Sequence, residues 1–226
     1  MKKGFLILLM LICAISVNAQ KGKSSGKAGK GGAVNNLSIG PIVGVNFSTL
    51  RGNDDSKFKA GFSGGIFANY SILENLGITA QVLYSTQGAK SKALSDASIK
   101  VNYFQIPVLL MYYLNKPGST FRPKIMLGPQ FGFLSSAKST TPAILGNGTV
   151  TVDAKNFYTD TDISGTLGLG FNYRVGKGMW LNVDARYSHG FENIAKPLPF
   201  SSPTANNSVI SIMAGISFAF GNYEDL

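Results

Sequence analysis

The stretch that decides the fold runs from Leu181 to Ser188 and reads LNVDARYS. Every second residue from Leu181 to Tyr187 is apolar or aromatic, and every second residue from Asn182 to Ser188 is polar or charged. Successive side chains of a β-strand point to opposite faces. The alternation therefore predicts a strand with one apolar face and one polar face.

Seven other stretches of the chain repeat this alternation. Their apolar faces span, in chain order, Leu37 to Phe47, Phe62 to Ile72, Leu76 to Tyr84, Phe104 to Tyr112, Ile125 to Phe133, Ile163 to Tyr173 and Ile210 to Phe220. Each run reaches about 10 residues, which is enough to cross a bilayer when the strand is tilted. The opposite faces carry mainly Ser, Thr, Asn, Gln and Gly, as expected inside a crowded barrel where unpaired charges are costly.

The connections between these runs alternate in length. Three are short and rich in turn residues, at 73–75, 115–119 and 176–178. Four are long, at 49–59, 88–98, 137–161 and 192–207. Outer-membrane barrels have short periplasmic turns and long external loops. The pattern therefore predicts an outer-membrane location with both chain termini in the periplasm.

Composition agrees with strands in lipid. The 226 residues are 44% hydrophobic and only 14% charged, against about 25% charged residues in an average soluble domain. Beyond the N-terminus there is no apolar run of about 18 residues, the length that a helical span needs. We expect an all-β fold, a single antiparallel up-and-down transmembrane β-barrel of about eight strands. A soluble secreted sandwich is the alternative.

The first 19 residues resemble a secretory signal. Lys2 and Lys3 precede an apolar segment, and we expect cleavage between Ala19 and Gln20. The single cysteine, Cys13, lies inside this segment. We expect a basic Gly/Ser/Lys linker over 20–36, with a tether to lipid or peptidoglycan as the alternative role, then the barrel over 37–221 and a tail over 222–226.

Several segments resemble the PorT-like outer-membrane β-barrel family. They are GFSGGIF at 61–67, QVLYSTQGA at 81–89, YFQIPVLL at 103–110, Arg122-Pro123 and LGP at 127–129. The resemblance covers most of residues 37–221. It implies an eight-stranded outer-membrane barrel, in a family with some members associated with secretion or gliding, and it carries over no catalytic residue.

Four charged residues are expected to point into the barrel: Lys124, Arg174, Asp184 and Arg186. We interpret them as a structural network that fills the lumen, because eight strands leave an interior just wide enough for side chains. Three glutamines would complete its hydrogen bonds, namely Gln81, Gln105 and Gln130. A charged pore lining is the alternative.

Other motifs have a simpler structural explanation. Ser188 and His189, the only histidine, are adjacent and would face opposite sides of a strand, so they do not predict a nucleophile and its base. Asp160 and Asp162, with Asp153, are too sparse for a calcium loop. Three glycines resemble part of a nucleotide-binding fingerprint without its βα turn, at positions 165, 168 and 170. We expect no catalytic residue, metal or cofactor.

Together these features favour a non-enzymatic envelope scaffold that displays external loops for binding or anchoring. A narrow channel or secretion accessory is the first alternative, and a lipid-modifying barrel enzyme is the second. The expected partners are outer-membrane lipid, the barrel-assembly machinery during biogenesis, and an unidentified envelope protein or extracellular ligand. Nucleic acid is not expected as a partner of an exported chain, despite the formal charge of +10.

Overall fold

The computed structural model describes residues 37–52, 55–94, 96–116, 118–143, 148–197 and 204–220. It contains nine strands and one short 3₁₀ helix among these residues: β1 (Leu37–Arg51), β2 (Ser56–Ser71), β3 (Leu76–Ser91), β4 (Ser98–Tyr113), β5 (Phe121–Pro142), β6 (Thr149–Asp153), η1 (Lys155–Phe157), β7 (Thr161–Gly176), β8 (Met179–Gly190) and β9 (Asn206–Phe220). None of the helices in the described residues has the length and apolar character to cross a membrane.

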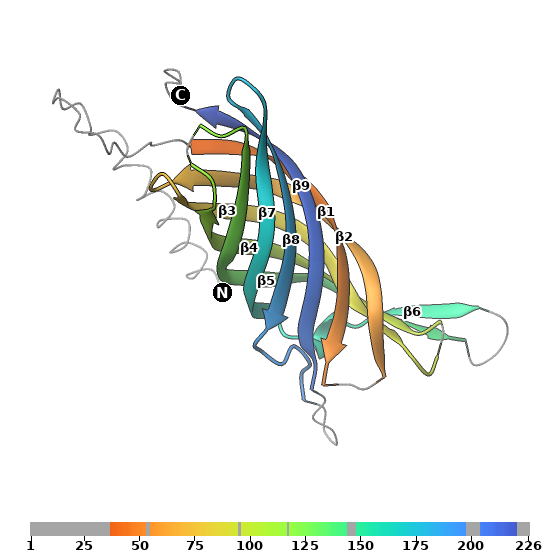
Figure 1. Cartoon of the computed structure of the whole chain (residues 1–226). Helices are drawn as coiled ribbons and strands as arrows, with labels where there is room; N and C mark the ends of the chain where they lie inside the picture. The colour runs from red at the N-terminus through yellow and green to blue at the C-terminus, as the bar shows by residue number, and fades with distance from the viewer. Residues whose placement is uncertain are drawn as a thin grey trace. The chain divides into compact units, whose positions relative to one another are not determined.

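Eight of the strands form a closed antiparallel barrel (Figure 1). The strand order is β4-β3-β2-β1-β9-β8-β7-β5, and pairing between β4 and β5 closes the ring. Strand β1 pairs with both β2 and β9, so the first and last strands lie side by side. Closure leaves no unpaired sheet edge in lipid, which is what allows strands to span a membrane. The expected all-β fold and strand number are confirmed.

The predicted alternation decides which face each side chain takes. In β8, Asn182, Asp184 and Ser188 are buried inside the barrel, whereas Tyr187 is 40% exposed on the outside. The outward residues of the other barrel strands follow the same rule, with Leu127 62% exposed and Leu169 63% exposed. In a soluble protein such exposure would be costly. On a barrel it forms the lipid-facing surface.

Aromatic side chains on the outer face form two rings. The ring near the short turns contains Tyr70, Tyr112, Phe121, Tyr173 and Phe218, and the ring near the long loops contains Phe47, Phe62, Tyr84, Phe104, Phe133 and Tyr187. Aliphatic residues occupy the band between the rings, as in Ile106, Val108 and Leu110 of β4. Aromatic girdles of this kind lie at the two membrane interfaces.

The loop end of the barrel is more regular than the sequence indicated. The segment expected to be a loop over 137–161 contains the last part of β5, all of β6 and η1. Figure 1 shows β6 projecting from the barrel wall at this end. Beyond Leu134 the outward residues are Ser, Thr and Lys rather than apolar. Strands outside the hydrocarbon region need no apolar face, so hydrophobic periodicity does not detect them.

Candidate functional site

A buried ion triad lies in the barrel lumen. Lys124 Nζ lies 2.9 Å from Asp184 Oδ1, and Arg186 lies 2.7 Å from Asp184 Oδ2. The side chains of all three are at most 5% exposed. Arg186 also donates to Gln81 Oε1 at 2.8 Å. A carboxylate between two cations offsets part of the cost of burying all three charges.

Gly170 makes room for this triad. It lies opposite Asp184 in the pairing of β7 with β8. A Cβ atom at position 170 would overlap Asp184 Oδ1 and the carbonyl oxygen of Val183. The glycine that sequence patterning attributed to strand packing is therefore required here by the close approach of the Asp184 carboxylate.

The four charged residues expected to point inward divide into two groups. Lys124, Asp184 and Arg186 form the triad, while Arg174 lies at the turn end and donates to the Gly118 carbonyl oxygen at 3.1 Å. The Arg174 guanidinium also lies 4.9 Å from the centre of the Trp180 ring. Among the described residues, neither Gln105 nor Gln130 has a hydrogen bond to the triad, although both are buried.

Neutral polar groups and apolar clusters fill the rest of the lumen. Asn46 donates to Ser63 Oγ at 2.6 Å and to Ser85 Oγ at 2.9 Å, linking three strands. Two apolar clusters separate such groups, one of Ile42, Phe67, Leu83 and Met213, and one of Leu109, Met111, Tyr113 and Met126. The lumen is therefore packed with side chains, as an eight-stranded barrel requires.

A third apolar cluster closes the lumen at the loop end. Its central residues are Val101, Tyr103 and Ile194, each fully buried. The loop between β8 and β9 supplies Ile194, and the segment after η1 supplies Tyr158, which pairs with Ala195 in an isolated bridge. Thr159 donates its backbone N–H to the Ile194 carbonyl at 2.8 Å. Burial raises the pKa of Tyr158. We call this cluster the loop cap.

The sequence alone did not identify the loop cap. Ile194 lies in a loop that is interrupted by Pro197 and Pro199, so no strand alternation indicates its burial. Asp162, which the spacing places beside the loop carboxylate of Asp160, lies in the lumen below the cap and accepts a hydrogen bond from Asn207 at 2.8 Å. Only tertiary contacts bring these loop residues together.

Ser188 and His189 lie on opposite faces of β8. Ser188 is buried and shares a hydrogen bond of 2.8 Å with Thr166. His189 lies on the outer side, where its Nε2 is 2.6 Å from the Arg51 guanidinium and its Nδ1 is 3.3 Å from the Tyr187 hydroxyl. The pair therefore has neither the contact nor the shared face that a nucleophile and its base need.

The acidic residues weighed for calcium do not converge. Asp153 and Asp160 are exposed in the loop region, whereas Asp162 is buried. Within the described ranges there is no group of three or more His, Cys, Asp or Glu side chains that could hold a metal ion. The predicted cleavage site at Ala19 and Gln20 lies outside the described residues, as do the whole linker over 20–36 and the tail over 222–226.

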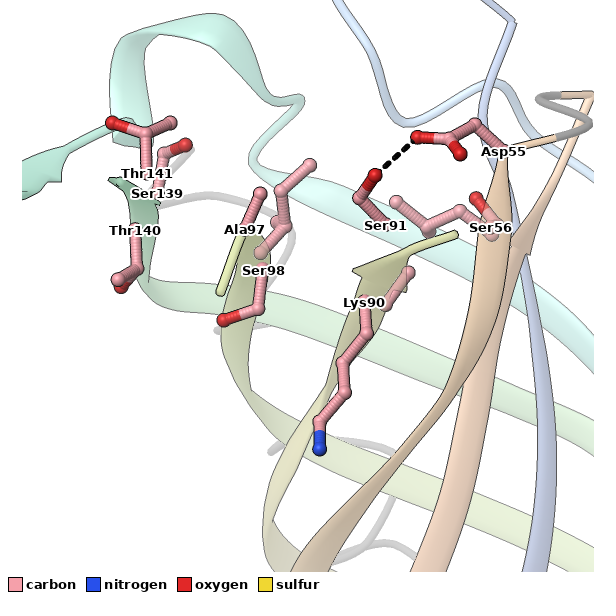
Figure 2. A pocket seen from close by; sticks show the side chains of 12 residues that line it. Asp55, Ser56, Lys90, Ser91, Ala97, Ser98, Ser139, Thr140 and Thr141 are labelled. Carbon is pink, nitrogen blue, oxygen red and sulfur yellow. Dashed lines mark hydrogen bonds between the residues drawn. The ribbon is translucent and has the colours of Figure 1, made fainter. Parts of the chain in front are cut away.

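A small pocket opens at the loop end between β2, β3, β4 and β5 (Figure 2). Its volume is about 180 Å³, and its lining combines six serine and threonine residues with four apolar residues, Lys90 and Asp55. Asp55 in the β1–β2 loop accepts hydrogen bonds from the Ser91 hydroxyl and from the backbone N–H groups of Lys92 and Ala93. These bonds, that from Ser91 foremost, hold the pKa of Asp55 below its ordinary value.

Comparison with known families agrees with this architecture. The family described as "Outer membrane protein beta-barrel domain" matches residues 18–196. The chain belongs to this family. The barrel is thus an outer-membrane barrel, and its apolar outer face is the lipid-facing surface. The match is to the general family, so the PorT-like resemblance stays a prediction.

Solved structures provide a second comparison. OprG from Pseudomonas aeruginosa is 16% identical, with 85% of this chain and 99% of that chain covered and a TM-score of 0.49. Neisserial surface protein A is 16% identical, with 81% and 97% covered and a TM-score of 0.48. Ail, the attachment invasion locus protein of Yersinia pestis, is 16% identical, with 82% and 99% covered and a TM-score of 0.45. No curated protein matches the chain.

Proposed function

We propose that the protein is a non-enzymatic envelope scaffold, a rigid barrel that displays its long loops outside the cell for binding or anchoring. The observation that carries the proposal is the filled lumen beneath a packed loop cap. Ion-paired Asp184 in the interior and fully buried Ile194 at the loop end obstruct a continuous water path. Rigid strands that position ordered loops are a common design for binding proteins.

The proposal includes an orientation. The long loops face the exterior, and both termini face the periplasm, as in other outer-membrane barrels with short periplasmic turns. The asymmetry in connection length supports this. The extension of β5 and β6 beyond the loop-side aromatic ring adds to this asymmetry, because the other end has only short turns.

Planar-bilayer recording separates the scaffold from the channel alternative. The folded barrel is expected to show no stepwise conductance, and the variant Ile194→Gly, which opens the loop cap, is expected to show none either because the Asp184 triad still fills the lumen. Regular conductance steps from the wild-type barrel would overturn the scaffold proposal in favour of a channel.

Cysteine labelling on intact cells tests the orientation. The only cysteine of the sequence, Cys13, lies in the expected signal segment, so an introduced cysteine gives a clean readout. A membrane-impermeant maleimide is expected to label Asn156→Cys in the loop region directly. It is expected to label Lys177→Cys in the β7–β8 turn only after the outer membrane is permeabilised. The reverse pattern would overturn the orientation.

A further inference from the structure

Five lysines form a continuous basic stripe on one side of the barrel, across the loop-side parts of β2, β3, β4 and β5. They are Lys57, Lys59, Lys90, Lys100 and Lys138. Lys57 is directly opposite Lys90 in the β2–β3 register, and Lys100 is directly opposite Lys138 in the β4–β5 register. Lys100 pairs with Gly88, two residues before Lys90. Four of the five side chains are exposed, and Lys59 is half-buried.

The positive charges of the stripe are not balanced within the described residues. None of the five lysines forms an ion pair with a described residue, whereas Lys124 and Arg186 in the lumen pair with Asp184. Lys59 donates to the Ser98 hydroxyl at 3.0 Å and is repelled electrostatically by Lys100 and Lys90. Asp153 faces Lys138 across β5 and β6, without an ion pair. Like charges on adjacent strands destabilise a sheet, so the stripe has charge available for an external anion.

The depth of the stripe indicates which anion this is. Tyr84 and Phe104 pack edge to face in the loop-side aromatic ring, with ring centres 5.4 Å apart. Lys100 and its partner Gly88 lie four residues farther along the same two strands. At about 3.3 Å per residue and a tilt of about 45°, this is about 9 Å beyond the rings along the membrane normal. The headgroup layer is about 5 to 8 Å thick, and a lysine side chain can bend back toward it.

Hydroxyl groups lie beside the lysines. Figure 2 shows Lys90, Ser98 and Thr140 projecting to one side of the strands, next to the pocket described above. Lysine ammonium groups and hydroxyl donors are common ligands of phosphate oxygens. On the opposite wall, the guanidinium of Arg51 contacts His189.

We propose that the stripe binds the phosphate groups of a phosphorylated glycolipid of the lipopolysaccharide type in the outer leaflet. The inference rests on the proposed orientation, which places the loop end on that leaflet. The stripe then fixes the β2–β5 wall against the headgroups, while the opposite wall relies on aromatic side chains.

The test uses the folded full-length barrel in detergent micelles, titrated with lipopolysaccharide and with the same material after chemical dephosphorylation. The stripe variant carries Lys90→Gln, Lys100→Gln and Lys138→Gln. The control variant removes the same charge elsewhere, with Lys116→Gln, Lys177→Gln and Lys196→Gln. Heat-modifiable mobility on gels verifies that both variants are folded.

We expect wild type and control to bind lipopolysaccharide equally, more tightly than the dephosphorylated form, and more weakly as salt rises. The stripe variant is expected to bind about a hundredfold more weakly, since each lysine near an anionic surface contributes about fivefold at low salt. Equal binding by the stripe variant, or equal loss by the control, would overturn this inference and leave the scaffold and its orientation standing. Tighter, stripe-dependent binding of soluble heparin would overturn it in favour of a soluble polysaccharide.

Discussion

The lumen and the outer wall of the barrel are built by the same strands, yet they accept charge in opposite ways. Within four residues of β8, Val183 and Ala185 face lipid, while Asp184 and Arg186 face the interior. The interior charges are tolerated because the Asp184 carboxylate lies between two cations, 2.7 Å from Arg186 and 2.9 Å from Lys124. The lipid-facing band offers a charge no partner at all. Whether a strand residue of this protein can carry a charge therefore depends on which face of the strand its side chain takes, and not on its depth in the membrane alone.

The largest effect is expected from breaking the triad. Asp184→Asn removes the carboxylate charge between Lys124 and Arg186 and leaves two buried cations without a counter-charge. Loss of one partner of a buried ion pair costs about 3–5 kcal/mol. Urea unfolding in lipid bilayers, followed by the shift in gel mobility, measures the free energy of unfolding.

Asp160→Asn is the matched control, because Asp160 is an exposed carboxylate in the loop region. It is expected to change the free energy of unfolding by less than about 0.5 kcal/mol. If the Asp184 and Asp160 variants unfold at the same urea concentration, the triad is not what permits charge in the lumen.

The second effect tests the outer wall. Leu127 lies midway between Phe121 and Phe133 on β5 and is 62% exposed to the lipid side. Leu127→Arg is expected to destabilise the folded barrel by about 2–4 kcal/mol, the cost of an arginine near the bilayer midplane. The same urea titration in bilayers measures the change.

Leu114 provides the control for this substitution. It is 55% exposed and follows β4, in the turn before β5. Leu114→Arg is expected to have little effect on unfolding, because the turn lies beyond the aromatic ring that contains Tyr112. An equal loss of stability in both variants would mean that exposure rather than lipid contact sets the penalty.

The third effect tests how closely the strands pack around the buried charges at one glycine. Gly170→Ala places a methyl group against the Asp184 carboxylate and the Val183 carbonyl, and such overpacking costs about 1–3 kcal/mol. At Gly176, on the same strand, the nearest atom to an added Cβ is the Met179 side chain at 3.6 Å. Gly176→Ala should therefore leave the urea midpoint unchanged, and a similar shift in both would contradict the packing role of Gly170.

The sequence predicts those strands in which one face meets lipid and the other meets the lumen, because this difference makes apolar and polar residues alternate. Strands in the bilayer, such as β8 with its LNVDARYS core, are recognisable because lipid and lumen demand different side chains. The inward position of Asp184 and its two partners follows from their place in the alternation and from their charge. Arg174 has the same place in the alternation but lies at the turn end, where it contacts the Trp180 ring and the Gly118 carbonyl instead of the triad.

The loop end could not be predicted in the same way. Beyond the aromatic ring neither face meets lipid. The end of β5 carries no amphipathic signal, and the alternation of Thr and Val in β6 extends over only 5 residues. In the loop cap, Ile194 of the β8–β9 loop is buried in one cluster with Val101 and Tyr103, which are distant in the sequence. The burial of Ile194 depends on how the loops fold over the barrel end, and the residues next to it in the sequence do not indicate this.

The smallest effect concerns Asp55, which is half-buried at the loop end and contributes through its hydrogen bonds. Its pKa is lowered below 3.8 in the folded loop, by the Ser91 hydroxyl first and then by the Ala93 amide. A group whose pKa is lowered on folding stabilises the folded form above its unfolded pKa, and this contribution is lost as pH falls through the folded value. The β1–β2 and β3–β4 loops should therefore stay joined at neutral pH and separate only below about pH 4.

Amide hydrogen exchange at Ala93 measures the separation of these two loops, with Asp96→Asn as the control for Asp55→Asn. Because Asp55 anchors a loop and not the barrel, Asp55→Asn should raise exchange at Ala93 while exchange in β8 stays unchanged. Faster exchange in both places would show that the loop end and the barrel are a single cooperative unit.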